Sequence, residues 1–542
     1  MFKISPHFLR DSRRRFTTRD VVTDAEVHVS RRRRLRTVFE GALVGLFVGL
    51  AIALYRFALG NAEHAMRFVT SLLKDGGALY LLWFAVLAGA CLLVGKLMRV
   101  EPYTQGSGIP QTVAEVAGKI DMPLARVIPI KFVEGVLCVF SGLSLGREGP
   151  SVLLGGLIGK AVSLVAHDNR QHERLLVTCG AAAGMSAAFH APLTGVLFAV
   201  EEIHKAFTAP LVISAMTASV AADLVCSQIV GQTPVIHFVT YVEMPHELFA
   251  SVVVMGVGCG IAGSLHNAGM FFVQERVFDR ITKHAPYLRI AVPFALAGVV
   301  AYFWPDLLCG GDAIIERLVN IDAGSIGILT LLLLGKYLFT NICFGSGAPG
   351  GTLLPLVVLG ALFGAIYGIV ASRFVGVPTT YESEFIVLGI AGLFAAVIQS
   401  PVTAVVLVFE LTGNLNALLA TTTVSLIAYV TATLLGTHPF YEHLSVRLLG
   451  TIESGDNDVA EKGTMVARTF QVGIGSLVES RTIQEIHWPK DMIVVSISRA
   501  GNESIANGQT RIEALDTLTI LMNAEQEDFI TQQVTSMCEA NT

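Results

Sequence analysis

Long apolar runs, separated by short polar or Gly/Pro-rich stretches, fill the chain from about Thr37 to Leu449. Examples are GALVGLFVGLAIALYRFAL, ALYLLWFAVLAGACLLVG and TLLLLGKYLFTNICF. Many of these runs are long enough to cross a hydrocarbon core of about 30 Å as helices. Others are too short or are interrupted by Gly and Pro. The pattern predicts an all-α polytopic membrane domain over residues 37–449.

The composition agrees with a lipid bilayer as the surroundings of this domain. Of the 542 residues, 53% are hydrophobic and 15% are charged, and the mean hydropathy is +0.62, which excludes an ordinary soluble protein of this length. The formal net charge of -5 gives no indication of a nucleic-acid partner, and we expect none.

The first forty residues are strongly basic, with ten arginines and one lysine, and RRRRLR directly precedes the first apolar run. Positive charge next to a span is retained on the cytoplasmic side, so we interpret residues 1–36 as a basic cytoplasmic tail. The stretch SRRRF resembles a twin-arginine export signal, but polar TTRDVVTDAEVHVS follows it where an apolar region is required. The tail is therefore the favoured interpretation.

The composition changes after Leu449, where TIESGDNDVAEKG is a polar stretch. We interpret residues 450–465 as a linker. Beyond it, DMIVVSISRAG and DTLTILMN have the pattern of strands, which predicts a small α/β domain over residues 466–542. The eight cysteines show no CxxC or Cys/His spacing, so we expect no metal site, no disulfide framework and no cofactor.

An internal repeat is present in the membrane domain. KFVEGVLCVFSGLSLGREGPSVLLGGLIG aligns with KYLFTNICFGSGAPGGTLLPLVVLGALFG at a constant offset of 205 residues, and a downstream pair of segments aligns at an offset of 209. The two blocks occur in the same order, which indicates a duplication, as in many transporters. The matched pairs are Lys131 with Lys336, Cys138 with Cys343, Gly146 with Gly351, Pro150 with Pro355, Pro192 with Pro401, Thr194 with Thr403 and Glu201 with Glu410.

Three stretches broken by Gly and Pro lie between apolar segments: GSGIP (106–110), GREGP (146–150) and GTLLP (351–355). Gly lets the backbone turn, and Pro suits the first turn of a new helix. Helices that begin at membrane depth present free N–H groups and a partial positive charge to an anion. The first half has the acid Glu148 where the second half has Leu353, so only one half supplies a titratable group there.

GSGIP, GREGP and GAPGGTLLP, in this order and spacing, resemble the CLC family of chloride channels and proton-coupled chloride transporters, as does HPFYEHL near the end of the membrane domain. The similarity covers roughly residues 35–449. It implies two inverted repeats and a homodimer with one anion pathway in each subunit.

The resemblance also implies roles for individual residues. Ser107 and Tyr441 supply hydroxyls to a central anion, the backbone amides around Thr352 and Leu353 line the same site, and Glu148 is a gate whose carboxylate occupies an anion position until it is protonated or displaced. The further residues of the matching motifs, which support the pathway, are Gly106, Gly108, Pro110, Lys131, Gly146, Arg147, Gly149, Pro150 and Gly351.

Further acids bear on proton movement. Glu202, at the end of VLFAVEEIHKAF, matches the internal proton glutamate of the family, whereas we expect Glu201 to be structural because the repeat pairs it with Glu410. Glu134 is an extra acid near Lys131, for which we expect a local ion pair rather than a second proton site.

Two positions depart from the family pattern, because Leu353 stands where Phe is usual and Leu354 where a small residue is usual. Coordination by backbone amides does not depend on these side chains, so we expect them to affect the rate of transport more than the substrate. At the position of Ser107, chloride-preferring members have serine and nitrate-preferring members have proline, so chloride is the expected anion.

The C-terminal region resembles the TrkA-C domain, also called RCK-C, through GSLVESRTIQEI, ISRAG and LDTLTIL. The resemblance implies a dimeric regulatory domain that binds a small ligand, such as cyclic di-AMP in some relatives. A role in assembly alone remains the alternative.

Taken with these resemblances, the sequence predicts a chloride/proton antiporter rather than an enzyme, in the inner (plasma) membrane with both termini cytoplasmic. The first alternative is a passive, voltage- or pH-gated chloride channel with the same anion site. The second is a sensor whose membrane part reports to the C-terminal domain.

Overall fold

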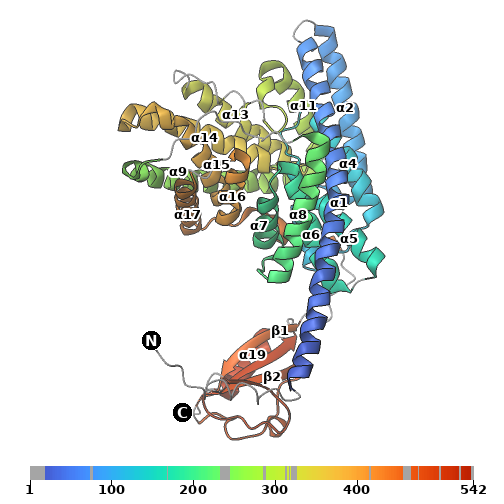
Figure 1. The fold of residues 1–542 in the computed structure, drawn as a ribbon, viewed down its shortest axis with the longest axis vertical. Coiled ribbons are helices and arrows are strands. Elements are labelled where there is room, and N and C mark those ends of the chain that lie inside the picture. The colour runs from blue at the N-terminus through green and yellow to red at the C-terminus, as the bar shows by residue number, and fades with distance from the viewer. Residues whose placement is uncertain are drawn as a thin grey trace, which may run out of the picture. The chain divides into compact units, whose positions relative to one another are not determined.

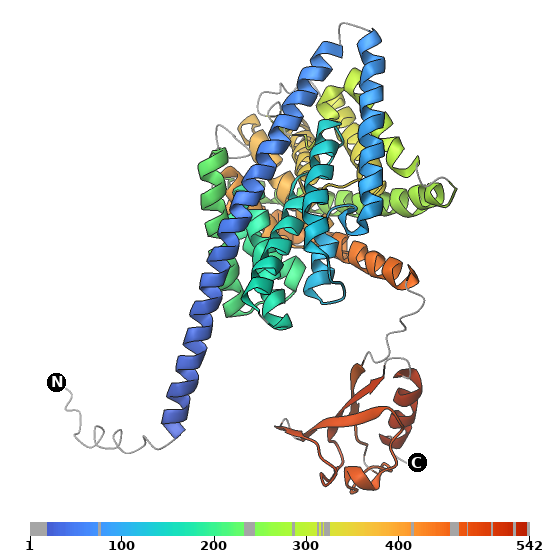
Figure 2. The ribbon, with the colours of Figure 1, turned by 90° about the vertical axis from the view of Figure 1, so that its right-hand side faces the viewer.

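The membrane domain is a bundle of helices that are connected mostly by short turns (Figures 1 and 2). The computed structural model describes residues 19–73, 77–167, 169–231, 244–284, 288–311, 314–315, 318, 326–413, 417–455, 465–473, 475–499, 502–523 and 527–538.

In chain order the α-helices of this domain are α1 (Arg19–Leu73), α2 (Gly77–Val100), α3 (Ile109–Val116), α4 (Leu124–Phe140), α5 (Glu148–Ala166), α6 (Arg170–Phe189), α7 (Pro192–Phe198), α8 (Ala209–Val230), α9 (Phe249–Phe272), α10 (Asp279–His284), α11 (Leu288–Phe303), α13 (Ile326–Gly345), α14 (Leu353–Val375), α15 (Glu382–Ile398), α16 (Pro401–Thr412), α17 (Leu418–Leu434) and α18 (Phe440–Gly455). The 3₁₀ turns are η3 (Pro102–Thr104), η5 (His246–Leu248), η7 (Pro305–Leu307) and η8 (Thr379–Tyr381), and the π-helical turns are η4 (Ala199–His204) and η6 (Val273–Phe278).

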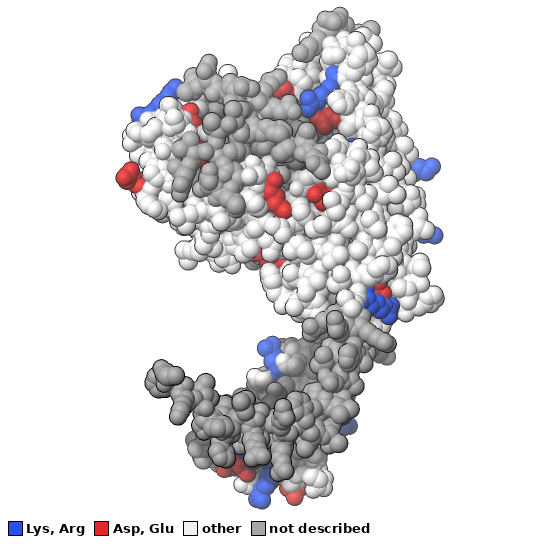
Figure 3. Space-filling model, in the orientation of Figure 1, with Lys and Arg blue, Asp and Glu red and all other residues white. Residues whose placement is uncertain are grey.

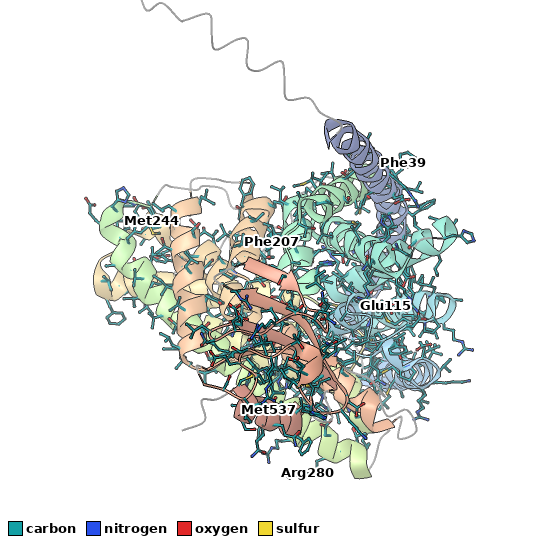
Figure 4. All side chains as sticks on the ribbon, turned by 90° about the horizontal axis from the view of Figure 1, so that it is seen from below. Phe39, Glu115, Phe207, Met244, Arg280 and Met537 are labelled. Carbon is teal, nitrogen blue, oxygen red and sulfur yellow. The ribbon has the colours of Figure 1, made fainter. Side chains whose placement is uncertain are left out.

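The surface of this bundle suits a lipid environment. Among the described residues, eight helical stretches are long and apolar enough to cross a membrane. Large apolar side chains point outward: Phe39 on α1 (Figure 4) is 71% exposed and Leu434 on α17 is 82% exposed. Lysine, arginine and acidic side chains are sparse over the described part of the bundle on the face in Figure 3. The prediction of an all-α polytopic membrane domain is confirmed.

Helix α1 begins at Arg19, so helical structure starts well before Thr37, where we expected the first span to begin. Residues 19–40 contain neither Gly nor Pro, and Arg is a good helix former. No residue type in this segment interrupts the helix, which therefore continues from the basic segment into the apolar run.

The two halves pack in equivalent ways. Helix α5 packs against α6 in the first half, and α14 packs against α15 in the second half. At each contact two glycines meet, Gly155 with Gly180 and Gly360 with Gly389, and neither pair leaves room for a Cβ atom. These glycines match each other at the offsets of 205 and 209 residues found in the sequence. The repeat in the sequence is thus a repeat in the packing.

The chain divides into two compact units between Gly450 and Thr451. In the second unit, β1 (Met465–Gln471), β2 (Met492–Arg499), β3 (Asn502–Ile505) and β4 (Thr517–Asn523) form an antiparallel sheet in the order β1-β4-β2-β3, with the turn η9 (Ile483–Glu485) and the helix α19 (Glu527–Cys538).

The core of this unit is formed by side chains such as Ile497, Ile520 and Val534. Buried Asp516 accepts two hydrogen bonds of 2.8 Å from Arg499, which fix the end of β2 next to the start of β4. The predicted strands in DMIVVSISRAG and DTLTILMN are confirmed as β2 and β4.

Candidate functional site

The two halves meet at repeat-equivalent glycines. Gly146 and Gly351 form an isolated antiparallel bridge in which the Gly146 N–H donates to the Gly351 carbonyl at 2.6 Å and the Gly351 N–H donates to the Gly146 carbonyl at 2.8 Å. Helix α5 begins two residues after the first glycine, and α14 begins two residues after the second. The bridge therefore places the N-terminal ends of two related helices side by side.

Glu148 is the first residue of α5, and its side chain is fully buried at this junction. Its Oε2 atom accepts a hydrogen bond of 3.4 Å from the backbone N–H of Leu354, in the first turn of α14. The first turn of a helix carries unpaired N–H groups and a partial positive charge. The carboxylate of one half thus lies at the position where the helix of the other half would attract any anion.

The GSGIP loop joins the same junction. The Gly106 N–H donates to the Gly347 carbonyl, and the Gly350 N–H donates to the Gly106 carbonyl, both at 3.0 Å. Gly108, the residue before α3, has φ = 98°, a conformation that favours glycine. This geometry places Ser107, which is 2% exposed, inside the domain against Gly149 of α5.

Tyr441, in the first turn of α18, completes the group of hydroxyls. Its hydroxyl is buried and has no hydrogen-bond partner, and the side chains of Ser107 and Thr352 lie beside it. Glu148 and Glu202 both lie within electrostatic range of Tyr441. A buried O–H group that donates no hydrogen bond within the protein can donate one to an anion.

The other predicted motif residues occupy the helix starts. Pro110 and Pro150 lie in the first turns of α3 and α5, where a missing N–H costs nothing. Arg147 directly precedes α5, and its carbonyl accepts hydrogen bonds from the Ser151 N–H at 3.1 Å and the Ser151 hydroxyl at 2.9 Å. The backbone amides of Thr352 and Leu353 belong to the start of α14.

Lys131 holds the GSGIP loop in place through hydrogen bonds. Its buried ammonium group donates to the carbonyls of Thr104 and Gly106, both at 2.7 Å. The expected ion pair with Glu134 is not formed as a direct contact, although the two charges attract each other. The ammonium group is held by the two carbonyls, and both Glu134 oxygens lie without a hydrogen-bond partner.

Glu202 lies in the π-helical turn η4, away from the glycine bridge. It is 7% exposed, and it accepts a hydrogen bond from the hydroxyl of Ser400, which directly precedes α16. A cleft of about 450 Å³ is lined by the next three residues of the chain, Ile203, His204 and Lys205, together with residues of α3 and α6. Because π-helical turns are rare and occur often at functional sites, this turn marks Glu202 as a candidate.

Glu201 points to a different partner. It accepts hydrogen bonds from the N–H of Thr403 at 3.0 Å and from its hydroxyl at 2.6 Å. In the equivalent arrangement, Glu410 accepts hydrogen bonds from the N–H of Thr194 at 2.7 Å and from its hydroxyl at 2.6 Å. Each glutamate therefore binds the first turn of a helix in the other half, which agrees with a structural role for Glu201.

The sequence analysis did not identify Ser400 or Tyr55. Ser400 pairs with Glu202 from a segment 198 residues away. Tyr55 on α1 is 1% exposed and lies within electrostatic range of Glu148. Neither residue stands in a recognisable motif, and only the tertiary fold brings them to the acids.

The fold and the site together define a polytopic membrane protein with two related halves, whose helix N-termini and buried hydroxyls converge at a site suited to an anion. The chain belongs to the voltage gated chloride channel family, whose model matches residues 89–433, and residues 468–531 match the TrkA-C domain. The resemblances found in the sequence are confirmed.

Similar proteins with known names share this family. The H+/Cl− exchange transporter ClcA of Vibrio cholerae serotype O1 (strain M66-2) is 32% identical over 427 residues, which are 76% of this chain and 91% of the relative. ClcA of Salmonella agona (strain SL483) is 30% identical over 77% of this chain and 89% of the relative. The crystal structure of a slow cyanobacterial Cl−/H+ antiporter has a TM-score of 0.72 and 29% identity, and the match covers 77% of this chain and 98% of that chain.

Proposed function

We propose that this chain exchanges chloride for protons across a membrane, with Glu148 as the gate of the anion pathway and Glu202 as the internal proton acceptor. The observation that carries the proposal is the hydrogen bond from the Leu354 N–H, in the first turn of α14, to the Glu148 carboxylate. A carboxylate at that place competes with chloride for the same N–H groups, and protonation removes its charge. The exchange named for the similar ClcA proteins and for the cyanobacterial antiporter supports this mechanism.

The proposed anion site combines backbone N–H groups at the start of α14 with the hydroxyls of Ser107 and Tyr441. Such donors stabilise chloride without a cationic side chain in direct contact, so the anion is not held too tightly to leave. Lys131 adds positive potential through the loop that it supports. Chloride is therefore the proposed substrate.

Glu202 suits a role in proton entry because it is nearly buried yet adjoins the cleft lined by Ile203, His204 and Lys205. The bond from the Ser400 hydroxyl fixes its side chain next to the start of α16. Protons reach Glu202 from the cytoplasm in this mechanism and pass toward Glu148 without using the chloride site.

The remaining predictions about assembly belong to the same proposal. The chain acts as a homodimer in the inner membrane with both termini cytoplasmic. The basic tail covers residues 1–36, the transport domain residues 37–449 and the linker residues 450–465. Residues 466–542 form a regulatory domain that binds a small ligand such as cyclic di-AMP.

The proposal is tested with purified full-length protein in liposomes under a steep chloride gradient. Wild-type protein moves protons against their gradient. Glu148→Ala removes gate and acceptor together, so chloride moves and protons do not. Glu202→Gln keeps the side-chain size and abolishes only the coupling. The control is Glu442→Gln, which removes a half-exposed acid paired with Lys205 at 2.6 Å and leaves coupling intact.

Each negative outcome has its own meaning. If the wild-type protein conducts chloride with no proton movement, the exchanger proposal fails and a passive chloride channel replaces it. If the wild type is coupled and Glu202→Gln remains fully coupled, exchange stands and the role assigned to Glu202 is wrong.

A further inference from the structure

Glu134, on α4, is a buried acid for which the proposed mechanism has no use. Its side chain is fully buried, and both carboxylate oxygens have no hydrogen-bond partner. An ionised carboxylate in such a place carries a large desolvation cost unless it is paired. A neutral carboxylic acid, which has a proton on one oxygen, avoids most of this cost.

The groups around Glu134 fit an acid that holds a proton. On α4, Lys131 and Cys138 lie one turn away on either side, and Lys131 donates to backbone carbonyls instead of to the acid. Glu101 and Thr104, in and next to the turn η3, lie close enough to influence the Glu134 carboxyl group. The Thr104 hydroxyl donates its hydrogen to the Glu101 carbonyl at 2.8 Å, so toward Glu134 it has only an oxygen to offer. The Cys91 thiol, on α2, lies within electrostatic range of Cys138.

Tyr55, on α1, lies close to this acid. It extends from α1 to α4, where its ring packs on Phe132 with centroids 5.2 Å apart and its hydroxyl lies against Gly135, leaving no room for a Cβ atom there. Glu134 and Glu148 both lie within electrostatic range of this phenol. The Tyr55 hydroxyl thus lies against the residue that follows Glu134, within electrostatic range of both buried acids.

The second half of the chain shows that Glu134 is not needed to hold the lysine. Lys336, the repeat mate of Lys131, is also buried and donates to two backbone carbonyls, Leu307 at 3.0 Å and Cys309 at 2.7 Å. At the offset of 205 residues, the position of Glu134 is occupied by Phe339. Lys336 therefore makes the same kind of contact as Lys131, although the position of the acid is taken by the apolar Phe339. The first half therefore carries two buried acids, Glu148 and Glu134, that the second half lacks.

We propose that Glu134 is a second buried proton-binding site, separate from Glu148. Glu134 binds a proton as a neutral carboxylic acid and releases it as a carboxylate, with the Tyr55 hydroxyl nearby. This inference rests on the proposed exchange of chloride for protons, which it extends by one proton site.

Proton binding is tested by infrared spectra of the purified full-length protein as the pH is changed, because the C=O band of a protonated carboxyl group is distinct from the bands of a carboxylate. In Glu148→Gln/Glu202→Gln, which lacks both acids of the proposed mechanism, a buried carboxyl band still titrates, and the further substitution Glu134→Gln removes it. Tyr55→Phe in the Glu148→Gln/Glu202→Gln background leaves Glu134 in place and shifts this band, because its neighbouring hydroxyl is gone. Tyr80→Phe, which removes a tyrosine hydroxyl bonded to the Gly298 carbonyl, is the control and leaves the band unchanged.

The proposal is overturned if no carboxyl band titrates in Glu148→Gln/Glu202→Gln, or if the band survives the addition of Glu134→Gln. The Tyr55→Phe spectrum decides the matter if the triple variant does not fold, since an unshifted band would also overturn the proposal. In liposomes, Glu134→Gln alone lowers the number of protons moved per chloride, and an unchanged ratio would contradict a role of Glu134 in the exchange. The spectra require no transport, so a wild-type protein that moves no protons would contradict the exchange mechanism and leave the infrared result interpretable.

Discussion

At the scale of single residues, the candidate site offers hydroxyls and backbone N–H groups to an anion. The Gly/Pro-broken motifs predicted helix starts with free N–H groups, and the family resemblance implied the roles of Glu148, Ser107 and Tyr441. The sequence did not predict the bond between Glu202 and Ser400 or the place of Tyr55, since both depend on segments distant in the chain. Local chemistry can be read from a motif, whereas a tertiary partner cannot.

Ser107→Ala and Tyr441→Phe should each weaken chloride binding. Each change removes one O–H donor to a desolvated ion, and a hydrogen bond to a charged group contributes about 1.5–3 kcal/mol. The affinity should fall about ten- to hundred-fold, as measured by isothermal titration calorimetry in detergent. Ser445→Ala is the control, because that hydroxyl donates to the Tyr441 carbonyl at 2.7 Å, one turn further along α18. Wild-type affinity in both site variants would show that the anion binds elsewhere.

At the scale of helices, contacts between the halves fix where the short helices begin. The first turn of α7 is bound by Glu410 of α16, and the first turn of α16 is bound by Glu201 of the turn η4. A carboxylate there satisfies free N–H groups and lies at the positive end of a helix. The repeat alignment matched Thr194 with Thr403 and Glu201 with Glu410, but it could not show that each glutamate binds the threonine of the other half, because an alignment contains no spatial contacts.

Replacement of Glu410 should lower stability and spare the coupling. Glu410→Ala loses three hydrogen bonds, from the Leu193 N–H and from the N–H and hydroxyl of Thr194. We expect a loss of about 1.5–3 kcal/mol, with Glu410→Gln intermediate because its amide oxygen still accepts. Thermal unfolding in detergent measures the order wild type, Gln, Ala. Uncoupled transport by the folded Glu410→Gln protein would contradict a purely structural role.

At the scale of the whole molecule, the chain divides into two compact units between Gly450 and Thr451, close to the change of composition after Leu449. The sequence could not predict that α18 continues to Gly455, past the start of the polar stretch. A polar composition does not end a helix in the absence of a residue that breaks it. Each unit has its own apolar core.

Removal of residues 456–542 should leave the anion pathway intact. Every side chain of the candidate site lies before α18 or in its first turn, and the described residues of the removed part form a four-stranded sheet, a short turn and a helix. Chloride flux and its coupling to protons should persist in liposomes, and any response to a small ligand should be lost. Size-exclusion chromatography with light scattering confirms that the truncated protein is folded and assembled. Loss of all flux in such protein would make the C-terminal unit part of the transport machinery.

The bridge between Gly146 and Gly351 is self-complementary, because each partner is the copy of the other. The two Thr–Glu contacts between the halves have the same property. Such reciprocity is the geometry of an isologous contact, which two identical subunits form about a two-fold axis. Two separate copies of one half, facing each other in the bilayer in opposite orientations, would meet through the same atoms. The interface therefore does not depend on the covalent link between the halves. What the fused chain gains is that its halves can differ, with the acid Glu148 on one side of the axis and Leu353 on the other.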